Sequence, residues 1–68
     1  MEPTAEAIYL RRRTQLSRAE FGARLGVSRW TVRRWETPDS PAPSERDLLA
    51  MRAVVAAIEA AKQAETAA

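Results

Sequence analysis

The sequence of 68 residues contains no cysteine and no histidine. Disulfides, the common zinc sites and thiol nucleophiles are therefore excluded, because each of them needs one or both of these residue types. A glycine-rich phosphate loop is missing too, and no set of residues suggests catalysis. We therefore expect a protein that is not an enzyme, with no metal, no cofactor and no small-molecule ligand.

Long apolar runs are also missing. The longest one, residues 53–58, has six residues, whereas a membrane-spanning helix needs roughly 20. The N-terminus is acidic before it becomes basic, which is the reverse of a secretion signal. These absences favour a soluble cytoplasmic protein that does not contact a membrane. A chain of this length makes one small domain, 1–68, with a marginal core, and such domains often need a partner.

Charge is distributed unevenly along the chain. Although the net charge is only +2, residues 11–34 carry eight arginines against one acid, which gives this segment a charge of +7. Residues 39–68 carry three basic and five acidic residues, which gives a charge of −2. A basic front with a slightly acidic rear is typical of a protein that meets a polyanion on one side.

Two short helices joined by a tight turn are predicted at residues 17–36. Ser17, followed three residues later by Glu20, is a capping-box start for the first helix. Gly26 ends that helix, because glycine adopts the left-handed conformation found at helix ends. Ser28 then offers the N-cap of the second helix. The rest of the chain is organised around this pair.

Apolar residues occupy the places where the two helices should meet: Phe21, Leu25, Val27, Val32 and Trp35. A side chain at Gly22 would push the helices apart where they cross. At 100° per residue, Trp30, Arg33 and Arg34 project from the opposite face of the second helix, with Arg29 on a flank. A capped helix with this outward face suits the major groove of DNA. The alternative is a solvated basic face on an ordinary helical hairpin.

These residues resemble the helix-turn-helix of the lambda-repressor-like (Cro/CI-type) regulators, including the small proteins related to HigA-type antitoxins. The matching segments are L-S-R-A-E-F, L-G-V-S-R and T-V-R-R-W-E, and the resemblance extends less sharply from residue 10 to about residue 55. It implies an all-α domain of four to five helices whose third helix reads double-stranded DNA. It further implies a transcriptional regulator, a bacterial or phage repressor that binds a pseudo-palindromic operator as a homodimer.

The resemblance also implies an ion pair between the first and third helices. In the family, an arginine at the position of Arg11 pairs with a glutamate at the position of Glu36. A bidentate pair of this kind would tie the two helices together and fix the angle at which DNA is read. The alternative is two solvated charges that contribute ~0–1 kcal/mol.

DNA contacts are expected from the start of the second helix and from the outward face of the third. The residues expected at base edges, by family position and geometry, are Arg29, Trp30 and Arg34. The residues expected at phosphates are Arg18, Ser28 and Arg33. Arg18 stands at a helix start whose dipole favours an anion. Trp30 would touch a thymine methyl, a sugar or a phosphate, or else pack across an arginine stem or a partner chain.

The segments on either side of the helix pair have patterns of their own. Apolar spacing predicts a helix over residues 5–14, with Leu10 in the core. Three prolines in residues 37–43 forbid a helix there. This loop has Asp39 and no basic residue, where family members often have glycine and basic residues that touch phosphates.

One long helix is predicted over residues 44–65, where the family usually has two shorter ones. Its apolar stripe should extend past the body of the domain, which predicts a dimer interface at Val54, Ile58 and Ala61. The opposite side is smooth and is the alternative seam, although alanine is also simply the best helix former. That side carries Ala53, Ala56, Ala57, Ala60 and Ala64. The same helix favours an alternative function, an antitoxin or protein-interaction module that binds a partner such as a toxin.

Overall fold

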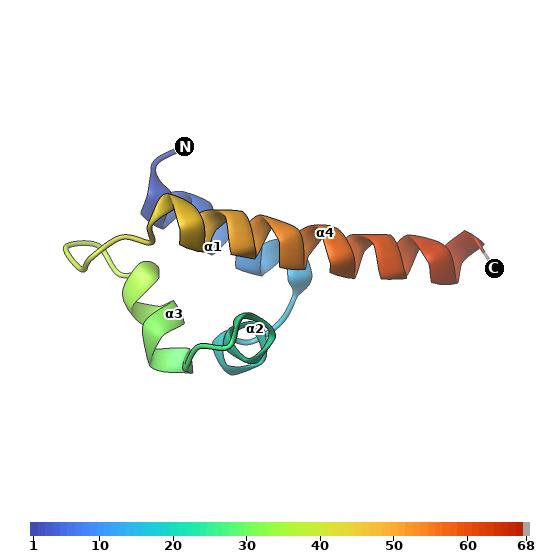
Figure 1. Ribbon diagram of the computed structural model, residues 1–68, viewed down its shortest axis with the longest axis horizontal. Coiled ribbons are helices and arrows are strands. Elements are labelled where there is room, and N and C mark those ends of the chain that lie inside the picture. The colour runs from blue at the N-terminus through green and yellow to red at the C-terminus, as the bar shows by residue number, and fades with distance from the viewer. Residues whose placement is uncertain (68) are drawn as a thin grey trace.

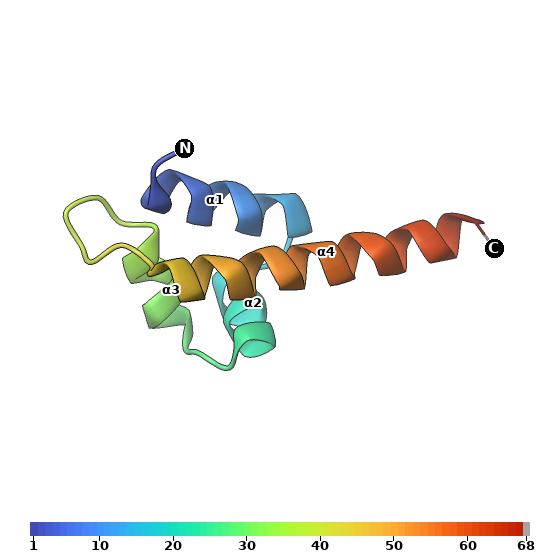
Figure 2. The same ribbon diagram turned by 45° about the horizontal axis from the view of Figure 1, so that its top comes forward.

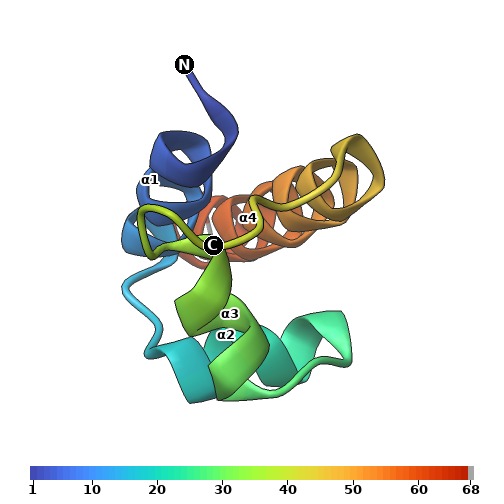
Figure 3. The same cartoon turned by 90° about the vertical axis from the view of Figure 1, so that its left-hand side faces the viewer.

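The computed structural model describes residues 1–67 and contains, within that range, four α-helices and no strand. The helices are α1 (Pro3–Thr14), α2 (Arg18–Leu25), α3 (Arg29–Trp35) and α4 (Glu45–Ala67). The predicted all-α class is therefore confirmed. α1 packs along the first part of α4, while α2 and α3 pack against each other below α4 in the view of Figure 1. The end-on view of Figure 3 separates these two helix pairs.

The hydrophobic core takes side chains from all four helices. Its buried members are Ala7, Leu10, Phe21, Val32, Trp35, Leu48, Met51 and Val55. Phe21, Val32 and Met51 are the largest side chains that are fully buried, and each such burial stabilises the fold by ~1.5–3 kcal/mol. Trp35 is only 9% exposed, so its predicted place in the core is confirmed. The core thereby fixes which face of α3 points outward.

The sequence places the start of the first helix near Pro3 or Thr4, and α1 begins at Pro3. Glu2 is its N-cap, and the carboxylate of Glu2 accepts a hydrogen bond of 2.7 Å from the amide of Ala5. Pro3 then occupies the first turn, where its missing N–H costs nothing. The spacing of apolar residues could not reveal this start, because the cap consists of polar contacts.

The last helix is continuous, as predicted, and runs to Ala67. Its start is fixed by a reciprocal pair of bonds: Ser44 N donates to the Asp47 carboxylate at 3.0 Å, and Asp47 N donates to Ser44 Oγ at 3.1 Å. Beyond the region where it packs against α1, α4 continues past the other helices (Figure 2).

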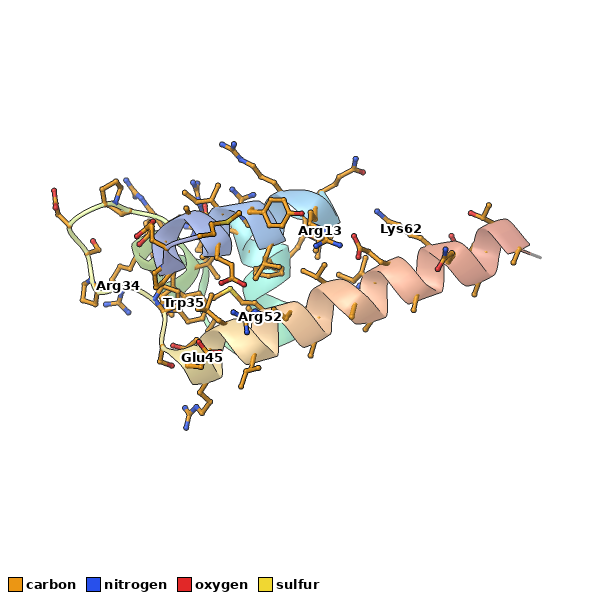
Figure 4. The ribbon with its side chains drawn as sticks, turned by 90° about the horizontal axis from the view of Figure 1, so that it is seen from above. Arg13, Arg34, Trp35, Glu45, Arg52 and Lys62 are labelled. Carbon is orange, nitrogen blue, oxygen red and sulfur yellow. The ribbon has the colours of Figure 1, made fainter. Side chains whose placement is uncertain are left out.

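Two ion pairs join α4 to α1. Arg52 Nε lies 2.7 Å from Glu6 Oε2, and Arg13 Nη2 lies 2.5 Å from Glu59 Oε1; Figure 4 shows Arg13 reaching toward α4. The hydrogen bond from Arg52 lowers the pKa of Glu6, and the bond to Glu59 raises the pKa of Arg13. Both pairs are partly solvated, so they contribute more to the angle between the helices than to stability.

Candidate nucleic-acid interface

The α2–α3 pair is held by its caps and by one close contact at a glycine. Ser17 Oγ accepts from Glu20 N at 3.1 Å while Ser17 N donates to the Glu20 carboxylate at 3.0 Å. The bonds from Ser17 lower the pKa of Glu20. Gly26 ends α2 with φ +76°, in the left-handed region that glycine adopts without strain. The turn that follows leads directly into α3.

Gly22 is needed at the turn between the helices. A Cβ built there would lie 2.7 Å from the carbonyl oxygen of Val27 and 3.3 Å from backbone atoms of Ser28. The close approach predicted at this glycine therefore exists, but the neighbour is the turn backbone that precedes α3. Val27 N also donates to Gly22 O at 2.9 Å, so the turn rests directly on α2. This contact sets the position of the first residue of α3.

The outward face of α3 carries the residues expected to read DNA. Arg29, Trp30, Arg33 and Arg34 are all exposed, and Trp30 retains 55% of its accessible surface. The guanidinium carbon of Arg29 lies 4.8 Å from the centre of the Trp30 ring, and that of Arg33 lies 5.8 Å away. Cation–π contacts of this kind hold side chains in place at a surface. The structure thus places two arginine heads over the indole.

An open hollow of about 760 Å³ lies between α1, α2 and α3. Its lining residues are Arg11, Ser17, Arg18, Ala19, Arg29, Trp30 and Arg33. Four of these seven residues are arginines, and Ser17 and Ala19 belong to the start of α2, whose positive dipole end favours an anion and already holds the Glu20 carboxylate in the capping box. The hollow therefore has the chemistry of a phosphate-binding surface.

Glu36 lies behind this hollow as the C-cap of α3, with a side chain only 3% exposed. Arg11 donates to it twice, from Nε to Oε2 at 2.6 Å and from Nη2 to Oε1 at 3.1 Å. The tie between α1 and the end of α3 that the resemblance implies is thus present in the structure. Removing one partner of such a buried pair typically costs ~3–5 kcal/mol, because the other charge loses its compensation.

The expected phosphate role of Arg18 assumed a side chain with no partner in the protein. In the structure, Arg18 Nε donates to Glu36 Oε1 at 3.0 Å. Its side chain is nevertheless 48% exposed and lines the hollow. Glu36 therefore serves two arginines, which the sequence reasoning missed. A residue at the start of α2 and one at the end of α3 gave no local signal of their contact.

Two further residues on α3 have contacts within the helix. The Ser28 hydroxyl accepts from Thr31 N at 3.3 Å as the N-cap, so its expected phosphate contact competes with capping. Arg34 Nη2 lies 3.4 Å from Thr31 Oγ1, which is a long and weak bond. The Arg34 side chain, labelled in Figure 4, is accordingly available for an outside partner.

The loop 37–43 adds no positive charge to this interface. Asp39 is exposed and adopts a left-handed conformation with φ 66°. Thr37 Oγ1 donates to Arg33 O at 2.6 Å, and Pro43 is buried. The loop thus closes the end of α3 and leads the chain back to the core, where α4 begins.

The interface expected on α4 is only partly outside the body of the domain. Val54 and Ile58 are half-buried, and Val54 packs against the core cluster, whereas Ala61 is exposed. The expectation that Val54 and Ile58 extend past the body with nothing to cover them is therefore wrong. The reason is that α1 continues beside α4 as far as the Arg13–Glu59 pair.

The opposite side of α4 is the solvent-facing one. The five alanines expected on the alternative seam (Ala53, Ala56, Ala57, Ala60 and Ala64) are all exposed. Leu49 begins the same side and retains 56% of its accessible surface, although its exposure was not foreseen. This side has no charged residue from Leu49 to Ala64, and it is exposed, whereas the other candidate seam is half-buried at Val54 and Ile58.

No protein-family model matches the chain, and no curated protein or solved structure is similar to it at a significant level. The resemblance to lambda-repressor-like regulators therefore rests on the motifs and the geometry described above. Among residues 1–67, no helix combines the length and the apolar character needed to cross a bilayer.

Proposed function

We propose that this protein is a lambda-repressor-like helix-turn-helix regulator that binds double-stranded DNA sequence-specifically. The observation that carries the proposal is the outward face of α3, where Arg29, Trp30, Arg33 and Arg34 are exposed on a helix fixed by the core. An exposed tryptophan and three arginines on one short, rigid helix contribute nothing to the core. They do match what the major groove offers, namely guanine acceptors, thymine methyl groups and flanking phosphates.

Roles within the interface are assigned by the family position of each arginine and by its place on the helices. Arg34 and Arg29, at opposite ends of α3, are assigned to base edges, where an arginine bidentate to guanine discriminates by ~1–3 kcal/mol. Arg33 and Arg18 line the hollow and are assigned to phosphates. Trp30 is assigned to the groove wall, since two guanidiniums hold its ring in place.

The charge distribution supports the same interface. The eight arginines of residues 11–34 give that segment a charge of +7, and four of them line the hollow. A protein that neutralises Z phosphates with such groups binds with a salt slope of about −0.9Z. We expect binding to weaken steeply with salt, and faster association with DNA at low ionic strength.

Selection of bound sequences from random duplex DNA tests the proposal. A defined motif is expected, with twofold symmetry if the protein binds as a homodimer. Arg34→Ala should relax the preference at one position of each half-site with a loss of ~1–3 kcal/mol. Arg46→Ala is the matched control, because Arg46 is an exposed arginine at the start of α4 and lies outside the interface. Binding to no duplex at low salt, or an Arg34→Ala variant that weakens every sequence equally, would contradict the proposal.

We propose further that two copies associate through α4. The support is the uncharged outward side from Leu49 to Ala64, together with the continuation of α4 past the other helices (Figure 2). Twofold pairing would present two α3 helices to half-sites about one helical turn apart, or a multiple of that distance.

The same side of α4 supports a second candidate function, an antitoxin or interaction module that binds another protein. The specific observation is that Leu49 is exposed at the N-terminal end of the alanine-rich side of α4. The alanine side chains there are small enough for another helix to approach closely. A stoichiometric complex with a second protein, in place of a homodimer, would favour this candidate. A homodimer through α4 and a complex of α4 with another protein are each compatible with DNA binding through α3.

A further inference from the structure

The two arginines on Glu36 differ in how much of each guanidinium is used. Arg11 donates from all three nitrogens, with Nε and Nη2 bonded to Glu36 and Nη1 bonded to Leu16 O at 3.2 Å. Arg18 donates from Nε alone. Within residues 1–67, neither of its terminal nitrogens has an acceptor. Arg11 is therefore a structural arginine, whereas Arg18 retains a free donor pair.

The bond through Nε determines where that free pair points. A guanidinium is planar, and the edge formed by its two terminal nitrogens faces a different direction from its Nε–H. Arg18 lines the hollow with a side chain that is 48% exposed, whereas Glu36 is buried and does not line it, so we infer that the bond through Nε leaves the terminal edge of Arg18 on the open side. A pair of N–H groups presented in this way matches the oxygens of one phosphate.

We propose that Glu36 is a positioning residue for DNA binding, which orients the Arg18 guanidinium so that its terminal nitrogens hold one phosphate of the duplex in the hollow. This inference rests on the proposed function. Glu36 does not touch DNA itself, since its side chain is 3% exposed. Glu36 orders the Arg18 side chain before DNA binds, so that less side-chain conformational entropy is lost when the phosphate binds.

The proposal makes a prediction opposite to that of charge alone. Glu36 places a negative charge behind a surface that binds a polyanion, so Glu36→Gln makes the interface more positive. If only net charge mattered, the variant would bind DNA more tightly. If Glu36 positions Arg18, the variant binds more weakly, because the side chain must be ordered on binding. Ordering one such side chain reduces affinity by roughly two- to tenfold.

The first experiment measures the dissociation constant of a labelled 30-bp duplex at several salt concentrations for the full chain and its variants. Arg18→Ala should bind about tenfold more weakly and reduce the salt slope by about 1. Glu36→Gln should weaken binding. The loss of duplex affinity caused by Arg18→Ala should be smaller in the Glu36→Gln background than in the wild type. Tighter binding by a folded Glu36→Gln variant, or equal costs in both backgrounds, would overturn the proposal.

The second experiment leaves Glu36 and its pair with Arg11 intact, so it decides the matter if Glu36→Gln does not fold. Lysine at position 18 keeps the charge, but its single nitrogen has to serve both the carboxylate and the phosphate. The affinity of Arg18→Lys for the duplex should therefore fall by most of the loss expected for Arg18→Ala. The matched control is Arg46→Lys, at an exposed arginine at the start of α4 that lies outside the interface, and its affinity should stay within about threefold of wild type.

The results separate this proposal from the proposed function. A wild-type protein that binds no duplex at low salt would refute DNA binding, and this inference with it. Wild-type binding with an Arg18→Lys variant as tight as Arg46→Lys would leave the DNA-binding function standing and overturn the role of Glu36. Weak binding by Arg18→Lys, with Arg46→Lys near wild type, supports the need for a guanidinium at position 18 that serves Glu36 and the phosphate together.

Discussion

Gly22→Ala adds one methyl group at the place where α2 meets the turn before α3. That methyl carbon would lie 2.7 Å from Val27 O, a distance that Cβ atoms essentially never adopt. The obstacle is a backbone carbonyl, so no side-chain rotation can relieve it. The turn must move as a unit, and the 2.9 Å bond from Val27 N to Gly22 O must lengthen.

The magnitude follows from two opposed effects. Overpacking a tight site costs ~1–3 kcal/mol, while replacing glycine by alanine inside a helix gains ~0.8–1 kcal/mol. Because the contact is with backbone, the cost lies toward the upper end, and we expect a net destabilisation of ~1–2 kcal/mol. Ala23→Gly is the matched control, since Ala23 is the next residue of α2, is exposed and should lose ~1 kcal/mol through helix propensity alone.

Urea unfolding followed by circular dichroism measures both variants, and duplex binding well below the unfolding transition separates them. Gly22→Ala should weaken binding beyond its loss of stability, because the start of α3 shifts with the turn. Ala23→Gly should bind as the wild type does once it is folded. A Gly22→Ala variant that is more stable than wild type by the helix-propensity gain would refute the close approach of the turn.

Two other predictions concern α4 and its ties. Ala57→Glu introduces a charge on the exposed side and should give a monomer with stability within about 0.5 kcal/mol of wild type, whereas Ile58→Glu should destabilise the fold because Ile58 is half-buried. A wild-type protein that sediments as a monomer at high micromolar concentration, with and without operator DNA, would exclude the dimer. The bond from Arg52 lowers the pKa of Glu6 below its ordinary value of 4.5, so this pair stabilises the fold above about pH 4.5 and loses its effect as pH falls through the lowered value. Glu6→Gln should therefore flatten the loss of urea stability below pH 4.5, and Glu65→Gln, at an exposed position near the C-terminus, should leave it unchanged.

The features that the sequence predicted are those determined within a few residues. The pairs Ser17 with Glu20 and Ser44 with Asp47 are three residues apart, and both form reciprocal caps. Gly26 ends α2 as expected. The outward direction of Trp30 and the burial of Trp35 follow from helical periodicity alone. The stacking of Arg33 on Trp30 was within reach as well, because i, i+3 neighbours on a helix touch, whereas the contact of the adjacent Arg29 does not follow from this rule.

The pairing of charges between helices was not predictable in the same way. Arg18 meets Glu36 across 18 residues, while Arg13 meets Glu59 and Arg52 meets Glu6 across 46. With eleven basic and nine acidic residues in the chain, no spacing rule selects these partners. The choice depends on where α1 and α4 come to lie side by side. Only the Arg11–Glu36 pair was foreseen, and that expectation came from the resemblance.

The partial burial of Val54 and Ile58 has a physical origin that also bears on where two copies would meet. Periodicity gives the direction of the stripe that contains Val54 and Ile58, but it does not give the position of α1 along α4, and α1 lies beside that stripe as far as Glu59. The side that stays exposed carries alanine, whose small hydrophobic burial offers little affinity per residue. A dimer through this side would therefore depend on close helix approach and on Leu49, and its affinity would be modest without DNA. Binding of two half-sites on one operator would supply the effective concentration that such a weak seam lacks.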